Sequence, residues 1–315
     1  MSATGGRARD GREPKTDSLR SLRADAVWSA LPARDQHLLL WLMAGDVVTA
    51  QLASLLVYGA LRVAQRRLAR LVEYGLLRGF WTASAQRPRG RYAYALTRTA
   101  RSDIERLQWP EGLPADRATE LPASPPIHQL ATHDLLAAFL RAGRPDAGEG
   151  IFAWAPERAC SQLFGFIRPD ALAGIRVDGR SLAMFIERDL GTERGEVLAD
   201  KVRRYRSVFS QAPDGGIAVG FVVESARRAQ SIHALGRRLP GGLPVVTAVA
   251  DQLLRDPLGA PWFDGQRMCS IEELAWATSG LEPIMAPGCL LDAETLAAFD
   301  DRAVSALPAV ALVRG

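Results

Sequence analysis

The sequence has few of the residues that mark a disulfide-bonded, zinc-binding or membrane protein. Its three cysteines, Cys160, Cys269 and Cys289, are widely spaced and form no CxxC pair. That spacing argues against a disulfide framework or a structural zinc site, and for a reducing compartment. No apolar run approaches the roughly 18–20 residues of a membrane span, and no signal-peptide core is recognisable at the N-terminus. We therefore expect a cytoplasmic protein with no membrane partner.

Lysine is the scarcest basic residue, because the chain has only Lys15 and Lys201 against 37 arginines. Basic charge is also unevenly placed. Residues 1–125 hold 19 Lys/Arg and 12 Asp/Glu, a net charge of +7, whereas residues 126–315 hold 20 and 23, a net charge of −3. The excess positive charge in the first part predicts nucleic acid as its partner.

A chain of 315 residues is long enough for two ordinary domains, and its 48% apolar content is typical of a globular protein. The composition predicts five parts, which are a disordered basic tail at 1–25, a DNA-binding domain at 26–109, a proline-rich linker at 110–126, a second domain at 127–256 and an extension packed on it at 257–315. Within the extension we expect helices near 271–277 and 292–299.

Three helical patterns followed by a hairpin pattern fill the first domain. The expected helices span 35–43, 47–56 (beginning near Thr49 as an N-cap) and 59–75, the last ending at Gly75; a hairpin with an Arg/Pro/Gly tip follows at 77–97, and a closing helix at 99–107. This is the element order of a winged helix-turn-helix domain.

The third helix has a face suited to the DNA major groove. We expect Leu61, Ala64, Leu68, Leu71 and Val72 to point inward and Arg62, Gln65, Arg66 and Arg70 to point outward. Arginine pairs with guanine and glutamine with adenine. The hairpin adds Arg87, Arg89 and Arg91, which suit phosphates or the minor groove. Two other interpretations stay open, namely a solvated face in an arginine-rich protein and a winged helix that binds protein.

A stretch from Arg168 to Tyr205 predicts an acidic cluster. Asp170 follows the apolar run FGFI, and Glu187 and Asp189 lie near the end of the strand-like run LAMFIERDL. Side chains two apart on a strand share a face, so Asp170 on a paired neighbour would complete a three-carboxylate cluster. Like charges gather at a free-energy cost unless a cation neutralises them. Oxygen ligands of this kind suit Mg²⁺ or Mn²⁺.

The remaining patterns predict a mixed or partly parallel sheet covered by helices on both faces. The expected elements are a helix at 127–143, a strand and turn at 151–163, the two acidic strands, a helix at 196–209 with Lys201 at the edge of its buried face, a strand at 216–225, a helix at 226–239 and a strand at 244–249. Glu157 is a possible further acidic group. His128 and His133, five apart, are expected to cap or pack rather than bind metal.

These motifs, in this order, resemble a known family. Pro169–Asp170 followed by Glu187-x-Asp189 looks like the PD-(D/E)xK nuclease fold. The chain over residues 30–250 is similar to the bacterial replication-relaxation family of plasmids and other mobile elements. The matching pieces are Ile127–His128 with Leu130, Glu157–Arg158, Pro169–Asp170, the strand ending Phe185–Asp189, Gly191–Thr192, and Lys201 with Tyr205. The resemblance implies a winged helix joined to a restriction-endonuclease-like domain, an α+β or α/β fold.

The resemblance implies roles for single residues. Asp170, Glu187 and Asp189 would hold Mg²⁺ or Mn²⁺, and Lys201 would orient the attacking water or offset charge at phosphorus. Arg188 should point to the opposite sheet face and has no catalytic role. The sequence departs from the nuclease pattern because Asp189 occupies the position of the usual lysine. Two hypotheses follow. The first is a replication or transfer protein that binds double-stranded DNA and also nicks or cleaves it, and the second is a DNA-binding regulator whose second domain only serves assembly. Under either hypothesis, a second copy of the chain and other replication or transfer proteins are possible partners.

Overall fold

The computed structural model describes residues 24–82, 90–108, 127–164, 167–191, 195–208, 217–236, 244–259 and 262–277. Almost all of the expected tail, the linker at 110–126, the hairpin arginines Arg87 and Arg89 and the helix expected at 292–299 lie outside these residues. In the described part, every helix is too short or too polar to span a bilayer. We call residues 24–108 the N-terminal unit and residues 127–277 the C-terminal unit.

The N-terminal unit is a small helical bundle with a three-stranded sheet. Its elements are α2 (Ala24–Ala30), α3 (Ala33–Gly45), β1 (Val47–Thr49), α4 (Ala50–Ala53), a π-helical turn η1 (Ser54–Tyr58), α5 (Leu61–Glu73), β2 (Leu77–Thr82), β3 (Arg91–Leu96) and α6 (Arg98–Gln108). The helices and the hairpin occur where the sequence predicts them. Thr49 caps α4, since its hydroxyl accepts a hydrogen bond from the Leu52 backbone N–H at 3.2 Å.

One element of this unit differs from the prediction. Val47 and Val48, at the start of the segment expected as the second helix but before its N-cap Thr49, form strand β1, and β1 pairs antiparallel with β3 to give the order β1-β3-β2. β-branched residues favour a pleated, half-buried position, and here Val48 enters the helical core while Val47 packs with Leu130 of the C-terminal unit. The short strand therefore packs on the helical core of the N-terminal unit through one face and on α7 of the C-terminal unit through the other.

The C-terminal unit alternates helices and strands. Its elements are α7 (Ile127–Ala142), a 3₁₀ turn η3 (Pro145–Ala147), β4 (Gly150–Pro156), α8 (Glu157–Phe164), β5 (Ala171–Val177), β6 (Arg180–Asp189), α9 (Gly195–Val208), β7 (Ile217–Val223), α10 (Ala226–Gly236), β8 (Val245–Val249), α11 (Ala250–Leu253), β9 (Trp262–Phe263), β10 (Met268–Cys269), α12 (Ile271–Leu274) and β11 (Trp276–Ala277). Two predictions are corrected: residues 157–164 form a helix rather than a turn, and the strand beside β6 follows Asp170 instead of preceding it.

The strands of this unit form one mixed sheet, as the sequence predicts, in the order β10-β9-β8-β7-β6-β5-β4, with β11 paired to β6. Strand β5 pairs antiparallel with both β4 and β6, whereas β6, β7 and β8 are parallel to one another and are joined by α9 and α10. Parallel neighbours require such crossover helices. In β6, all residues after Arg180 are buried. The charged residues at the end of this central strand, Glu187, Arg188 and Asp189, therefore lie in the interior.

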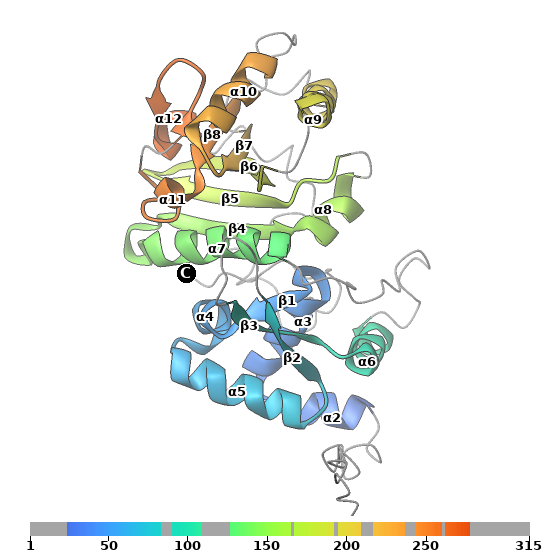
Figure 1. Cartoon of the computed structure of the whole chain (residues 1–315). Helices are drawn as coiled ribbons and strands as arrows, with labels where there is room; N and C mark the ends of the chain where they lie inside the picture. The colour runs from blue at the N-terminus through green and yellow to red at the C-terminus, as the bar shows by residue number, and fades with distance from the viewer. Residues whose placement is uncertain are drawn as a thin grey trace, which may run out of the picture.

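The two units pack against each other around α7, which Figure 1 shows between the sheet of one unit and the helices of the other. One hydrophobic core runs through both units. At its edge, the buried Asp46 carboxylate contacts both units. It pairs with Arg101 of α6 at 2.9 Å and Arg158 of α8 at 2.7 Å, and it accepts a hydrogen bond from the Gln129 amide of α7 at 3.1 Å. The units are thus joined by a shared core and a shared carboxylate.

Candidate functional site

The outer face of α5 carries the residues expected to read DNA. Arg62, Gln65, Arg66 and Arg70 are all exposed. Among the described residues, Arg62 and Arg66 have no ion-pair partner, whereas Arg70 pairs with Glu73 at 3.1 Å and stacks over the Tyr74 ring. Two cationic heads and one amide on this face are therefore available to an external ligand.

The inner face of α5 is narrower than predicted. Ala64, Leu68 and Leu71 are buried, but Leu61 and Val72, expected to point inward, are exposed. These two residues lie at the ends of the helix, where it runs beyond the elements packed against it.

Arg67 points inward, which the sequence did not indicate. It forms an ion pair with the fully buried Asp35 of α3, and the Tyr58 hydroxyl donates to the same carboxylate at 2.8 Å. Burial, then the Asp35 carboxylate, raises the pKa of Tyr58 well above its usual range, so the phenol stays a hydrogen-bond donor. The pairing orients α5 on α3, since moving α5 would leave the Asp35 charge unpaired.

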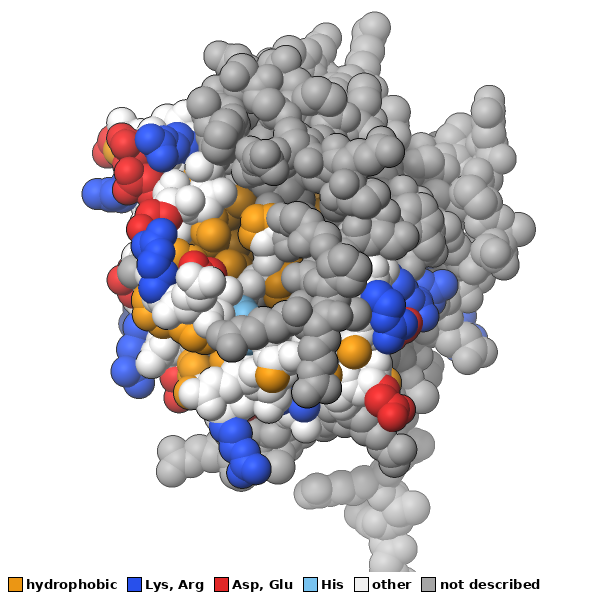
Figure 2. Space-filling view, turned by 90° about the horizontal axis from the view of Figure 1, so that it is seen from above, with side chains coloured by type: hydrophobic (Ala, Val, Ile, Leu, Met, Phe, Trp, Pro, Cys, Tyr) orange, Lys and Arg blue, Asp and Glu red, His pale blue; other side chains and the backbone are white. Residues whose placement is uncertain are grey.

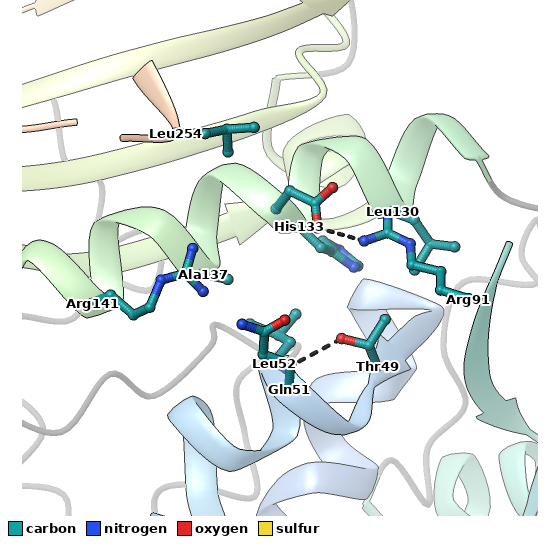
Figure 3. Close-up of a pocket in the computed structure, with 10 residues that line it drawn as sticks. Thr49, Gln51, Leu52, Arg91, Leu130, His133, Ala137, Arg141 and Leu254 are labelled. Carbon is teal, nitrogen blue, oxygen red and sulfur yellow. Dashed lines mark hydrogen bonds and ion pairs between the residues drawn. The ribbon is translucent and has the colours of Figure 1, made fainter. Parts of the chain in front are cut away.

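Of the three hairpin arginines, only Arg91 lies in the described residues, and it does not face solvent. Its guanidinium pairs with Asp134 of α7 at 2.5 Å, and its side chain is only 20% exposed. Figure 3 shows Arg91 at one end of a pocket that both units line. Arg91 therefore contacts the C-terminal unit, and its role in DNA binding stays a prediction.

The pocket beside Arg91 has a volume of about 160 Å³ and is lined from both units by Thr49, Gln51, Leu52, Leu130, His133, Asp134, Ala137, Arg141 and Leu254. His133 is buried and its ring lies 4.8 Å from that of Trp41. Burial, reinforced by the charge of Arg91, lowers the pKa of His133 to about 3, so the imidazole is neutral. As the sequence suggested, His133 packs in the interior.

A second polar cluster lies where β5 begins and β6 ends. The antiparallel register pairs Ala171 with Ile186, which brings Asp170 beside the last residues of β6. One Asp170 oxygen accepts the backbone N–H of Arg188 at 2.5 Å. Glu187 is almost fully buried in the same region. Sheet register thus brings together the first two carboxylates that the sequence singled out.

Helix α9 supplies the partners of Glu187. Lys201 and Tyr205 lie four residues apart and so share a helix face. The Lys201 ammonium donates to one Glu187 oxygen at 2.9 Å, and the Tyr205 hydroxyl donates to the other at 2.6 Å. Lys201 therefore lies within hydrogen-bond distance of the carboxylate, from the helix the sequence predicted.

Glu187 has a strongly perturbed acidity. Burial raises the pKa of Glu187 to about 7, and the nearby charge of Asp170 adds to the effect, while Lys201 and Tyr205 oppose it. This carboxyl thus takes up its proton at a higher pH than a solvent-exposed glutamate does. Perturbed carboxyls of this kind concentrate at functional sites, although structural pairs produce them too.

Asp189 does not join this cluster. One of its oxygens accepts the Gly191 backbone N–H at 2.8 Å, and the other pairs with Arg228 of α10 at 2.5 Å. Within the described parts of the chain, no three His, Cys, Asp or Glu side chains are placed to hold a metal ion. The three-carboxylate arrangement expected from the sequence is therefore not formed. Arg188 lies apart from the cluster, with its guanidinium paired to Glu224 and bonded to the Val222 carbonyl.

Two further residues belong to the cluster: His128, which the sequence did not assign to it, and Glu157, which the sequence indicated only as a possible further acidic group. The His128 imidazole of α7 lies 2.8 Å from the second oxygen of Asp170, and this contact raises the pKa of His128 although burial opposes it. Glu157, at the start of α8, is close enough that burial and the charge of Asp170 raise its pKa. Both belong to the short motifs Ile127–His128 and Glu157–Arg158, which were the signal that could have found them.

The three candidate carboxylates already have partners within the chain, which bears on whether they could hold a divalent cation. All six carboxylate oxygens of Asp170, Glu187 and Asp189 accept a hydrogen bond from a donor of the chain or form an ion pair with one. A cation would have to displace Lys201 or His128, and in the described residues no third His, Cys, Asp or Glu is placed with Asp170 and Glu187 to hold it. The described geometry does not fit Mg²⁺ or Mn²⁺, and the metal-binding and catalytic roles of these residues stay predictions.

The C-terminal unit presents mixed charge on its upper face. Figure 2, seen from above, shows described basic and acidic side chains interspersed, with hydrophobic side chains between them. Elsewhere in the unit, charged side chains of α9 pair locally, since Arg203 and Arg204 both form ion pairs with Asp200. The described part of this face therefore differs from the arginine-bearing face of α5.

Together, the fold and sites define a mixed α and β protein with an arginine-bearing helix in one unit and a buried polar cluster in the other. The model of the replication-relaxation family matches residues 39–219, more than half of the chain. The chain therefore belongs to the replication-relaxation family, which confirms the resemblance seen in its motifs and associates the protein with replication or relaxation. Comparison with curated proteins and with solved structures gives no match.

Proposed function

We propose that this protein binds double-stranded DNA in the replication or transfer of a plasmid or mobile element, through a winged helix-turn-helix formed by the N-terminal unit. The element order supports this proposal, since α3, α4 with η1, and α5 precede the β2–β3 hairpin. The observation that carries it is the outer face of α5, where Arg62, Gln65 and Arg66 are exposed and the two arginines lack ion-pair partners among the described residues.

The proposed contact places α5 in the major groove. Arg62 and Arg66, four residues apart, project from one side of the helix and suit guanine or phosphate, while Gln65 suits adenine. Arg67 is excluded from the contact because Asp35 holds it inside. Specificity would thus come from three neighbouring side chains, and the general attraction from the net positive charge of the first 125 residues.

The test is duplex binding by the full chain, measured by fluorescence anisotropy over a series of salt concentrations. Replacing both Arg62 and Arg66 with alanine is expected to weaken binding at least about tenfold, since each good arginine contact contributes about 1–3 kcal/mol. Arg203→Ala is the matched control, because Arg203 is an exposed arginine of the C-terminal unit that pairs with Asp200. Equal effects of the control and of the α5 variant would overturn the proposal.

For the C-terminal unit we propose a nuclease-like domain that serves assembly of the DNA complex. Every oxygen of its three candidate carboxylates already has a donor from the chain, which supports an internally satisfied cluster rather than an open reaction site. In this arrangement Lys201 and Tyr205 stabilise buried Glu187, and His128 stabilises Asp170.

DNA nicking or cleavage is the second candidate function. The observation that favours it is the convergence of Asp170 and Lys201 on Glu187, the residue types that the PD-(D/E)xK resemblance implies. The two candidates separate when supercoiled plasmid is incubated with the protein and Mg²⁺ or Mn²⁺. An assembly role predicts intact plasmid. Nicking that disappears in Glu187→Gln but persists in Glu196→Gln, a control at an exposed site of α9, would establish the second candidate instead.

A further inference from the structure

We infer that the β2–β3 hairpin binds unpaired DNA bases through an exposed aromatic pair, Trp81 and Tyr92, so that the protein prefers single-stranded or locally melted DNA next to duplex. The inference rests on the proposed DNA-binding function and adds a class of substrate to it. It concerns a different surface from the outer face of α5.

The aromatic pair is unusually open to solvent. Trp81 is 70% exposed and Tyr92 is 41% exposed. By contrast, Trp41, Trp154 and Trp262 are buried in the core. Trp81 and Tyr92 are register partners on the two strands, and their rings lie edge to face with centroids 5.5 Å apart. The pair is therefore a preformed aromatic surface rather than one isolated exposed ring.

The backbone beneath the pair accommodates it. Tyr92 lies across β2 at Gly79, where an added Cβ would overlap the Tyr92 ring and hydroxyl. Tyr94 continues the row, with its ring centroid 5.1 Å from that of Tyr92. The lack of a side chain at Gly79 thus leaves room for Tyr92 to lie against the strand and to support Trp81.

The aromatic pair lies on the sheet face that the helices cover. Residues 77 and 81 of β2 alternate to the same side, and Leu77 is buried in the helical core that includes Leu68 and Leu71 of α5. Towards the hairpin tip this face extends past the helices, and there Trp81 and Tyr92 become exposed. The opposite face, with Ala93 and Ala95, packs on Leu130 of α7. The exposed aromatic surface is thus on the same side of the sheet as α5.

The charge of the hairpin favours nucleic acid as the occupant. Residues 77–96 contain four arginines, four aromatic residues and no Asp or Glu. Among them, Arg78 is exposed and its guanidinium lies 5.4 Å from the centroid of the Phe80 ring. Interleaved arginine and aromatic residues attract the phosphate backbone and stack on bases. An apolar protein surface would match the rings but would offer no counter-charge to the exposed Arg78.

Unpaired bases match the pair better than a continuous duplex does. The faces of duplex bases are covered by their neighbours, whereas those of single-stranded or melted DNA are free to stack on an indole. With α5 bound to duplex, the hairpin would contact bases where the duplex opens. Opening of a duplex is a step that DNA replication requires, which agrees with the family.

The experiment compares three labelled oligonucleotides at one salt concentration: a duplex, the same duplex with a central unpaired bubble, and one single strand. Binding by the full chain is measured by anisotropy for wild type and Trp81→Ala. The variant is expected to weaken binding to the bubble and the single strand by roughly 5- to 100-fold, from the loss of one base stack, and to change duplex binding less than about twofold. Trp81→Phe should restore most of the affinity.

Controls keep this inference separate from the function on which it rests. Met268→Ala removes an exposed apolar side chain of the C-terminal unit and should leave all three affinities unchanged. Arg62→Ala with Arg66→Ala should weaken the duplex most. Equal loss on all DNAs, or no loss, for Trp81→Ala would overturn the inference while leaving duplex binding by α5 intact. A wild-type dimer that Trp81→Ala converts to monomer in sedimentation velocity would instead assign the aromatic pair to a second copy of the chain.

Discussion

In the N-terminal unit, Arg62 and Arg66 extend from α5 without ion-pair partners among the described residues, whereas in the C-terminal unit every oxygen of Asp170, Glu187 and Asp189 has a donor from the chain. Both regions contain the residue types that the sequence marks as functional. Only the first leaves the side chains of these residues exposed and without ion-pair partners among the described residues. The comparison teaches that a charged motif in a sequence does not by itself tell whether the fold neutralises its charge.

Arg67 gives the largest expected effect within this comparison. Arg67→Met should lower the free energy of unfolding by about 3 kcal/mol, because it leaves the fully buried Asp35 charge without its cation. Its neighbour Arg66 is exposed, so Arg66→Met should change stability by less than about 0.5 kcal/mol. Urea unfolding measures both variants. Similar values for the two would show that the inward and outward arginines do not differ as described.

Glu187 gives a pH-dependent effect. Its pKa in the folded protein, about 7, is above the ordinary value of 4.5, so its contribution to stability is complete below about pH 4.5 and is lost as pH rises through 7. We expect this loss to be roughly 2–3 kcal/mol and to be absent in Glu187→Gln. Urea unfolding between pH 4.5 and 8 checks the prediction, with Glu196→Gln as an exposed control on α9. A wild-type slope retained in Glu187→Gln would contradict it.

Arg91 gives the smallest effect and sharpens the comparison within the N-terminal unit. Because Arg91 pairs with Asp134 of α7, Arg91→Met should cost up to about 1 kcal/mol of stability. It should change duplex affinity less than about twofold, whereas Arg62→Ala should weaken it more. A loss of duplex binding in Arg91→Met as large as in Arg62→Ala would place Arg91 on the DNA surface.

Local pattern predicted the elements of the fold but not their partners. The apolar run of β6 and the helical stripe of α9 placed Glu187 and Lys201 correctly on a strand and a helix. The pairing of Asp189 with Arg228 could not be predicted. Arg228 lies on α10, 39 residues after Asp189 in the chain, and the two side chains meet only because α10 packs beside α9 in the folded protein. Likewise, the sequence does not distinguish Arg67 from its neighbour Arg66. Arg67 points inward because α3 places Asp35 beside it, and that contact depends on how the helices pack. Strand β1 could not be predicted either, because its two valines pair with β3, which comes much later in the chain.

The Asp46 carboxylate also sets the geometry between the units. Since it binds Arg101 on one side and Arg158 and Gln129 on the other, rotation of one unit against the other would expose or unpair a buried charge. The two units should therefore move as one rigid body. The distance between a ligand on α5 and a ligand on the C-terminal unit would then be fixed by the packing of the units, and not by the length of the segment that connects them. Protein–DNA complexes of this chain would then share one spacing, whatever the sequence between their contact points.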